Sequence, residues 1–334
     1  MRQRVLLFSV TLLLLALLDL FVGGRPLSVE SVVRVLCGQD SEGDIATRVI
    51  VFDYRLPRLL TALLVGIALP TSGILMQSLF QTPLAGPYVL GISSGASLGS
   101  ALVILVGGVT FTYWLGSPLG VAIAAMLGAG GVLCLLLIAA RQTQSRYALL
   151  VIGMLLSAAC GAVITLLESL SSNHALRDFV VWTMGSLSGV YDEALVCLTL
   201  TTLLGWGLAW ASAARLNLLQ LGLSHAATLG LNVRTTYTLL FVATGVLAGG
   251  ATAFCGPIGF VGIAIPYLAR RLLATSDHRR LLLFTPLVGA CGVVMVDLIG
   301  AVVGRWVLLP LNAMTAVLGI PVVLQMMLGK KPLD

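Results

Sequence analysis

Ten apolar runs account for most of the chain, and nine of them are long enough to cross a membrane. We expect helices at about 5–23, 59–80, 89–107, 119–139, 147–168, 195–214, 236–254, 257–269, 282–303 and 311–328. A membrane-spanning α-helix needs about 20 mainly apolar residues. The run at 257–269 is too short to cross alone, but short spans occur where they pack on protein or line a cavity. The pattern predicts an all-α polytopic membrane protein with about ten transmembrane helices.

The composition excludes an ordinary soluble protein. Hydrophobic residues make up 58% of the chain, charged residues make up 10%, and the mean hydropathy is +1.05, whereas about a quarter of the residues in a soluble domain are charged. The first run lacks the cleavage pattern of a signal peptide, so we expect it to be retained as a span. Most of the 37 glycines are expected to serve close helix packing. The six cysteines have no metal-binding or redox spacing.

The distribution of charge predicts the orientation. With the N-terminus on the cytoplasmic side, the inner side receives twelve Lys and Arg residues and the outer side receives seven. An excess of basic residues marks the cytoplasmic side. We therefore expect both termini to be cytoplasmic and an external loop at 24–57, in which 27–36 has the pattern of an amphipathic surface helix.

Few residues offer catalytic chemistry. The chain has no G-x-x-x-x-G-K-[ST] motif, the loop that cradles the phosphates of ATP. His174, His225 and His278 fall in predicted loops, where we expect them to face solvent. We assign no catalytic residue and no metal ligand, and an enzyme is the least favoured class.

Acidic residues inside spans bear on ion-coupled secondary transport. Asp19 and Glu168 lie toward helix ends, where we expect them to reach water, and Asp297 is the exception. A structural partnership of Asp297 with a neighbouring Arg or amide is favoured over a proton relay. A secondary transporter is the leading alternative from another functional class.

Two arginines, Arg55 and Arg58, introduce the second span on its outer side. This is the wrong side for residues that set the orientation. They either reach to lipid phosphates or form an external docking site for an acidic partner, because guanidinium groups pair in a planar, bidentate way with carboxylates.

The longest inner loop, 215–234, has leucines in two short helical patterns. Gly222 and Gly230 break these patterns, and Ser224 is expected to cap the second helix. A separate motor subunit would grip such an element. A helix resting on lipid is the alternative.

Six stretches together resemble the FecCD-type permeases, the membrane subunits of ABC importers for iron chelates and cobalamin. They are ordered as in that family and run from about residue 50 to the end. The stretches are RLPR (55–58), TPLAGPYVLGISSGASLG (82–99), WTMGSLSG (182–189), LNLLQLGLSHAATLGL (216–231), GPIGFVGIAIPYLAR (256–270) with DHRR (277–280), and AVLGIPVVLQMML (316–328).

The resemblance implies a type II ABC importer architecture, with residues 1–334 as a single permease domain in the bacterial inner membrane. The implied partners are a second copy of the chain, two cytoplasmic ATPase subunits that bind the ATP, a periplasmic or lipid-anchored substrate-binding protein, and the bilayer. No nucleic acid and no cofactor of its own are implied. The expected cargo is an iron chelate, either a siderophore or haem, and cobalamin is the alternative.

The resemblance also implies sites for coupling, gating and translocation. A short helix at about 175–190 would line the outer mouth, and Gln144 with Ser145 would form a cytoplasmic gate. Coupling helices at about 216–232 would meet the ATPase through Leu218, Leu221, Gly222, Ala226, Leu229 and Gly230. The pathway would be lined by Ser93, Ser94, Gly95, Gly256, Gly259 and Gly262.

The resemblance also implies that the substrate-binding protein docks on Arg55 and Arg58 and on a third arginine after the ninth span. That third position holds Ala301 here, and Arg305 lies one helical turn further. We expect Arg305 to substitute for it.

Overall fold

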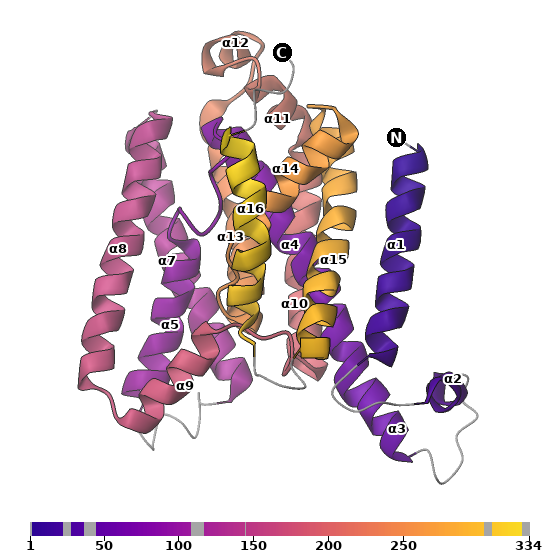
Figure 1. The fold of residues 1–334 in the computed structure, drawn as a ribbon. Coiled ribbons are helices and arrows are strands. Elements are labelled where there is room, and N and C mark those ends of the chain that lie inside the picture. Colours follow the sequence, from indigo (N-terminus) through magenta and orange to yellow (C-terminus); the bar gives the residue numbers. More distant parts are fainter. Residues whose placement is uncertain are drawn as a thin grey trace.

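The protein is a bundle of helices that run between two ends (Figure 1). The computed structural model describes residues 2–22, 28–36, 45–107, 117–143, 145–303 and 309–328. Ten helices match the predicted spans. They are α1 (Arg2–Phe21), α4 (Leu56–Phe80), α5 (Ile92–Val106), α7 (Pro118–Gln142), α8 (Arg146–Leu170), α10 (Asp192–Ala211), α13 (Val233–Cys255), α14 (Val261–Leu273), α15 (His278–Val303) and α16 (Leu311–Leu328).

Eight helical segments in the described part of the chain are long and apolar enough to cross a membrane. The two shorter helices that match predicted spans are α5, with 15 residues, and α14, with 13. The all-α membrane fold is therefore confirmed, and ten is an approximate count of the spans.

Shorter helices lie at the two ends of the bundle: α2 (Val29–Leu36), α3 (Ile45–Val49), the π-helical turn η2 (Ile50–Arg55), α9 (Asn173–Thr183), α11 (Ala213–Leu219) and α12 (Leu223–Thr228). The amphipathic helix expected at 27–36 is α2. Residues 45–55 of the expected loop are instead helical and continue into α4. The η2 turn precedes Pro57, whose missing N–H interrupts the α-helical hydrogen-bond pattern.

The central helix is α4, which packs against α10, α13, α14 and α15. Helix α4 belongs to the helical segment Ile45–Phe80, and 78% of the most apolar 18-residue window of that segment is buried. The buried share of the corresponding window is 11% in α1, 17% in α8 and 22% in α16. The exposed faces of these three outer helices carry large aliphatic side chains. Such faces suit contact with lipid or with another membrane subunit.

Glycines allow the backbones of the inner helices to approach closely. A Cβ atom on Gly289 of α15 would lie 2.0 Å from the carbonyl oxygen of Gly66 on α4. A Cβ atom on Gly73 of α4 would lie 1.8 Å from the carbonyl oxygen of Gly262 on α14. Close packing of this kind is the main attraction between helices in lipid, so the packing role expected for glycine is confirmed at these contacts.

The two ends of the bundle carry different elements (Figure 1). Helices α11 and α12 lie at the end where α1 begins and α16 finishes, and α2, α3 and α9 lie at the opposite end. We refer to these as the α12 end and the α9 end. Because α1 begins and α16 finishes at the same end, the chain makes an even number of net crossings.

We expect Gly128→Ala on α7 to destabilise the bundle by about 1–3 kcal/mol, the usual cost of overpacking an interior. The new Cβ atom would lie 2.1 Å from the carbonyl oxygen of Gly95 on α5. Gly131→Ala, on the same helix, is the matched control, because a Cβ atom there has nothing within 4 Å. It should be neutral or stabilising by up to about 1 kcal/mol. Unfolding in mixed micelles by added SDS measures both, and equal losses would contradict the close-contact explanation.

Candidate functional site

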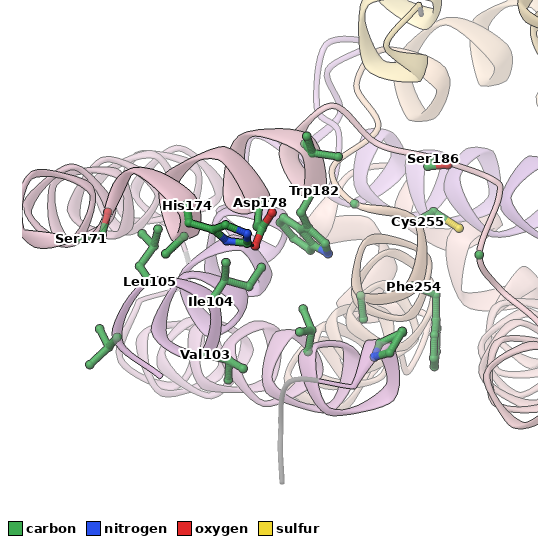
Figure 2. A pocket seen from close by; sticks show the side chains of 18 of the residues that line it. Val103, Ile104, Leu105, Ser171, His174, Asp178, Trp182, Ser186, Phe254 and Cys255 are labelled. Carbon is green, nitrogen blue, oxygen red and sulfur yellow. The ribbon is translucent and has the colours of Figure 1, made fainter. Parts of the chain in front are cut away.

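A cavity of about 1020 Å³ opens at the α9 end. Its wall combines the end of α5, the start of α7, the end of α13, and α9 with the residues on either side of it (Figure 2). The lining is mainly apolar, with aliphatic side chains and the aromatic rings of Trp182 and Phe254, and it also includes four serines, one histidine and one aspartate. His174 and Asp178 lie side by side on α9, with 3.0 Å between His174 Nδ1 and Asp178 Oδ2. The volume is at the upper end of roughly 300–1,000 Å³, the usual range for small-molecule sites.

Helix α9 is fixed in the wall of this cavity by a cap and a buried ring. The hydroxyl of Ser172 accepts a hydrogen bond from the N–H of Ala175 at 3.4 Å, as an N-cap residue does. Phe179 is buried and stacks on Trp182 with ring centroids 6.2 Å apart. The short outer helix expected at 175–190 is therefore observed at Asn173–Thr183.

Gly256, one of the six residues expected to line the pathway, is part of the cavity wall. Its φ is +73°, and a Cβ atom would lie 2.5 Å from the carbonyl oxygen of Trp182. A glycine is required here, because other residues rarely adopt this φ and none has room for its side chain. The N–H of Ser186 donates to the carbonyl oxygen of Cys255 at 2.9 Å, which ties the chain after α9 to the end of α13.

The other five expected pathway residues contact neighbouring segments of the subunit. The hydroxyl oxygen of Ser93 lies 3.2 Å from that of Thr252 on α13, and that of Ser94 lies 2.6 Å from that of Ser157 on α8. The remaining three, Gly95, Gly259 and Gly262, lie against Gly128, Asn312 and Leu69 respectively. A pathway role for these five stays a prediction.

Arg58 and Asp297 form a bidentate ion pair between α4 and α15, toward the α9 end. Arg58 Nε donates to both carboxylate oxygens of Asp297, at 3.0 and 2.8 Å, and Nη2 donates to Oδ1 at 2.6 Å. The side chain of Asp297 is 4% exposed and that of Arg58 is 35% exposed. The expected partnership of Asp297 with an arginine is confirmed.

Arg55 and Asp19 lie beside this pair, and both are buried. Arg55 Nη1 donates to the carbonyl oxygen of Leu20 at 2.5 Å. A cavity of about 260 Å³ is lined by Asp19 and both arginines, together with Ala301. The expectation that Asp19 reaches water is wrong, because α1 packs on α15 and encloses this end of the helix. Docking by these arginines stays a prediction, and Arg305 lies outside the described residues.

At the α12 end, the two short helices expected in 215–234 are α11 and α12. Both helix breaks occur at glycines in the left-handed region, Gly222 with φ +92° and Gly230 with φ +87°. The N-cap of α12 is Gly222 without a side-chain bond, so the expectation that Ser224 caps this helix is wrong. Ala226 is buried, while Leu221 and Leu229 are 57% and 60% exposed. Leu218 of α11 is half-buried.

His278 is buried at the start of α15 and contacts Ser78, Asn217 and Gln220. The expectation that it faces solvent in a loop is wrong, because α11 folds back over it. Asn217 also donates to the carboxylate of Asp277 at 2.9 Å, and this hydrogen bond is the main reason that the pKa of Asp277 is lowered. The sequence signal for the cluster was the three-residue spacing of Asn217 and Gln220, which places them on one helix face.

The expected gate lies at the junction of α7 and α8. Ser145 caps α8, where its hydroxyl accepts a hydrogen bond from the N–H of Ala148 at 3.3 Å. Ser145 is exposed, and Gln144 lies outside the described residues. The gate role of both residues stays a prediction.

We expect Arg58→Ala to lower the free energy of unfolding by about 3 kcal/mol, because it leaves the carboxylate of Asp297 unpaired inside the bundle. Arg58→Ala combined with Asp297→Asn should recover most of this loss, since the remaining amide carries no charge. SDS titration of the three proteins measures the difference. A double variant no more stable than Arg58→Ala would show that the pair contributes little.

Comparisons with known proteins identify similar chains. The model of the FecCD transport family matches residues 11–329. The vitamin B12 import system permease protein BtuC of Salmonella paratyphi A is 36% identical over 279 residues, which cover 83% of each chain. BtuC of Klebsiella pneumoniae subsp. pneumoniae is 36% identical over 282 residues, covering 84% of this chain and 83% of that protein.

Solved structures share the fold. A structure described as an inward-facing conformation of a metal-chelate type ABC transporter matches with a TM-score of 0.84 at 30% identity, covering 98% of this chain and 99% of the other. PsaBC from Streptococcus pneumoniae, solved in complex with a Fab, matches with a TM-score of 0.57 at 16% identity, which shows the fold alone.

Proposed function

Since the chain belongs to the FecCD transport family and is the permease of an ABC importer, we propose that it carries a large metal chelate across the bacterial inner membrane. An iron chelate, either a siderophore or haem, and cobalamin are the two candidates. Relatives described as vitamin B12 permeases favour cobalamin. The match to a metal-chelate type transporter supports the wider class.

The cavity at the α9 end is the observation that carries this proposal. Its volume of about 1020 Å³ suits a large cargo. Its aliphatic and aromatic wall offers dispersion contact to a bulky organic ligand, and His174 faces Asp178 within the same wall. Because most of this wall is apolar, it selects mainly for size, and the proposal assigns the choice of cargo to the binding protein.

A second copy of the chain is the proposed partner in the membrane. Helices α8 and α16 are little buried in the single subunit. Exposed aliphatic side chains project from both, among them Leu155 and Leu166 on α8 and Val317 and Leu324 on α16. A homodimer would cover part of these faces and enclose a pathway between the subunits.

Two separate ATPase subunits are proposed to drive transport from the α12 end, which the proposal places in the cytoplasm with both termini. The exposed Leu221 and Leu229 lie just before and just after α12, whose Ala226 is buried, and they provide an apolar contact surface on both sides of this helix. The proposal assigns ATP hydrolysis to these partners, and no catalytic residue or cofactor to this chain.

We expect Leu221→Asp with Leu229→Asp to reduce co-purification of the ATPase subunit at least tenfold. Burying a leucine contributes about 1.5–3 kcal/mol, and about 1.4 kcal/mol corresponds to a tenfold change in affinity. Leu328→Asp is the control, because Leu328 is 82% exposed at the same end on α16. Unchanged association of the double variant would remove α12 from the proposed interface.

The binding protein is proposed to dock at the α9 end through Arg55 and Arg58. Because Arg58 already pairs with Asp297, a carboxylate of the partner must share or replace that contact. Asp297→Asn should therefore increase stimulation of the ATPase by the loaded binding protein, whereas the double variant Arg58→Ala with Asp297→Asn should lose it. ATPase assays in vesicles compare the two, and equal stimulation would exclude Arg58 from docking.

The cargo is tested in vesicles that hold the permease, its ATPase and its binding protein. Uptake of cyanocobalamin, haem and a ferric hydroxamate siderophore is measured with and without internal ATP. We expect one of the three to accumulate with ATP and to be insensitive to an ionophore. Uptake that persists without ATP and collapses with an ion gradient would favour the secondary transporter. Transport of none of them would contradict the cargo class.

A further inference from the structure

A buried polar cluster centred on His278 joins three elements at the α12 end. His278 is the first residue of α15 and is 1% exposed. Its ring contacts Ser78, near the end of α4, and Asn217 of α11. These contacts connect segments that are 200 and 61 residues apart in the sequence.

Asn217 and Gln220 both contact the ring of His278. Asn217 Oδ1 accepts from the backbone N–H of His278 at 2.8 Å, and Asn217 Nδ2 donates to Asp277 Oδ1 at 2.9 Å. Asn217 Oδ1 lies 2.9 Å and Gln220 Nε2 lies 3.0 Å from His278 Nδ1, so this ring nitrogen faces both an acceptor and a donor. His278 Nε2 lies 2.6 Å from the hydroxyl oxygen of Ser78. One ring thus links α11 to α4 through both of its nitrogens.

Two glutamines strengthen the same junction. Gln81, which follows α4, donates to the carbonyl oxygen of Leu219 at 2.8 Å. Gln220, which follows α11, donates to the carbonyl oxygen of Ser276 at 2.6 Å. Helix α11 is therefore held against the end of α4 and the start of α15 by directional contacts, whereas α12 beyond it is largely exposed.

We propose that His278 is the positioning residue through which α11 transmits the movement of the ATPase subunit to α4 and α15. This inference rests on the proposed function. A partner that seats on α12 displaces α11, and the ring of His278 transfers that displacement to both long helices at once. The same two helices carry Arg58 and Asp297 toward the α9 end. Ser78 and Arg58 are separated by about 30 Å along α4 at 1.5 Å per residue.

Coupling across such a distance requires measured coupling between the residues, not proximity alone. The assay is cargo transported per ATP hydrolysed in vesicles, using whichever of cyanocobalamin, haem and the ferric hydroxamate the wild type takes up. His278→Gln keeps a polar group near Nε2 but removes the ring nitrogen that contacts Asn217. Ser78→Ala removes the contact with α4.

We expect each variant to lower transport per ATP about threefold or more, with the ATPase still bound and its basal rate within about twofold of the wild type. The double variant should be no worse than the worse single variant, because both break one route. Thr285→Val is the control. Thr285 is buried on the same helix, and its hydroxyl has no hydrogen-bond partner in the described part of the chain.

Unchanged transport per ATP in both variants, within an intact complex, would overturn the role of His278. If His278→Gln fails to assemble, Ser78→Ala alone decides, because it removes a single hydroxyl. A loss equal to that of Thr285→Val would show a packing role only, and would also overturn the inference. Failure of the proposed function is distinguishable, because the wild type itself would then show no ATP-driven uptake.

Discussion

The close packing of α4 against α14 and α15 is the contact on which the rest of the bundle depends. In lipid, apolar helices gain little from leaving their surroundings, and association comes from van der Waals contact between backbones that approach closely. This approach depends on Gly66, Gly73, Gly262 and Gly289. At each of them a side chain would come too close to a backbone carbonyl oxygen of the neighbouring helix. This packing explains how the 13-residue α14 lies within the bundle. Five of its 13 residues are buried, and contact with protein is the condition for a short helix at membrane depth.

Polar contacts are concentrated toward the two ends of α4, while its middle is packed by small and aliphatic residues. Toward the α9 end, Arg58 is paired with Asp297, and toward the α12 end, Ser78 meets His278. Both partners belong to α15, so α4 and α15 are joined by directional contacts at two levels and by close backbone contact between them. Two helices held in this way move together more readily than one slides past the other. Such a pair is suited to carry a displacement from one end to the other, as the proposed role of His278 requires.

The sequence predicts the helices better than the contacts between them. The spans were predictable because a bilayer requires about 20 apolar residues, and the breaks at Gly222 and Gly230 because glycine readily adopts a positive φ. The burial of Asp19 was not predictable, since a carboxylate near a helix end reaches water unless another helix covers it, and here α15 packs on α1. The same reason applies to His278, whose partner Ser78 lies 200 residues earlier in the chain.

Ser224 is not the cap expected for α12, because Gly222 is the N-cap of that helix and has no side chain to form a hydrogen bond. The partnership of Asp297 was predictable in kind, because a buried charge needs an opposite charge.

Asn312 gives the α9 end a fixed geometry. Its N–H donates to the carbonyl oxygen of Met184, just after α9, and its Oδ1 accepts from the N–H of Gly259, just before α14. The start of α16 is therefore bound to two segments at once, one of which continues into the wall of the large cavity at Ser186. Among the described residues, α8 makes no hydrogen bond to Asn312, and most of its surface is exposed. The cavity wall near Ser186 and the first turn of α16 should consequently move together, so that a movement of α16 changes the shape of the cavity.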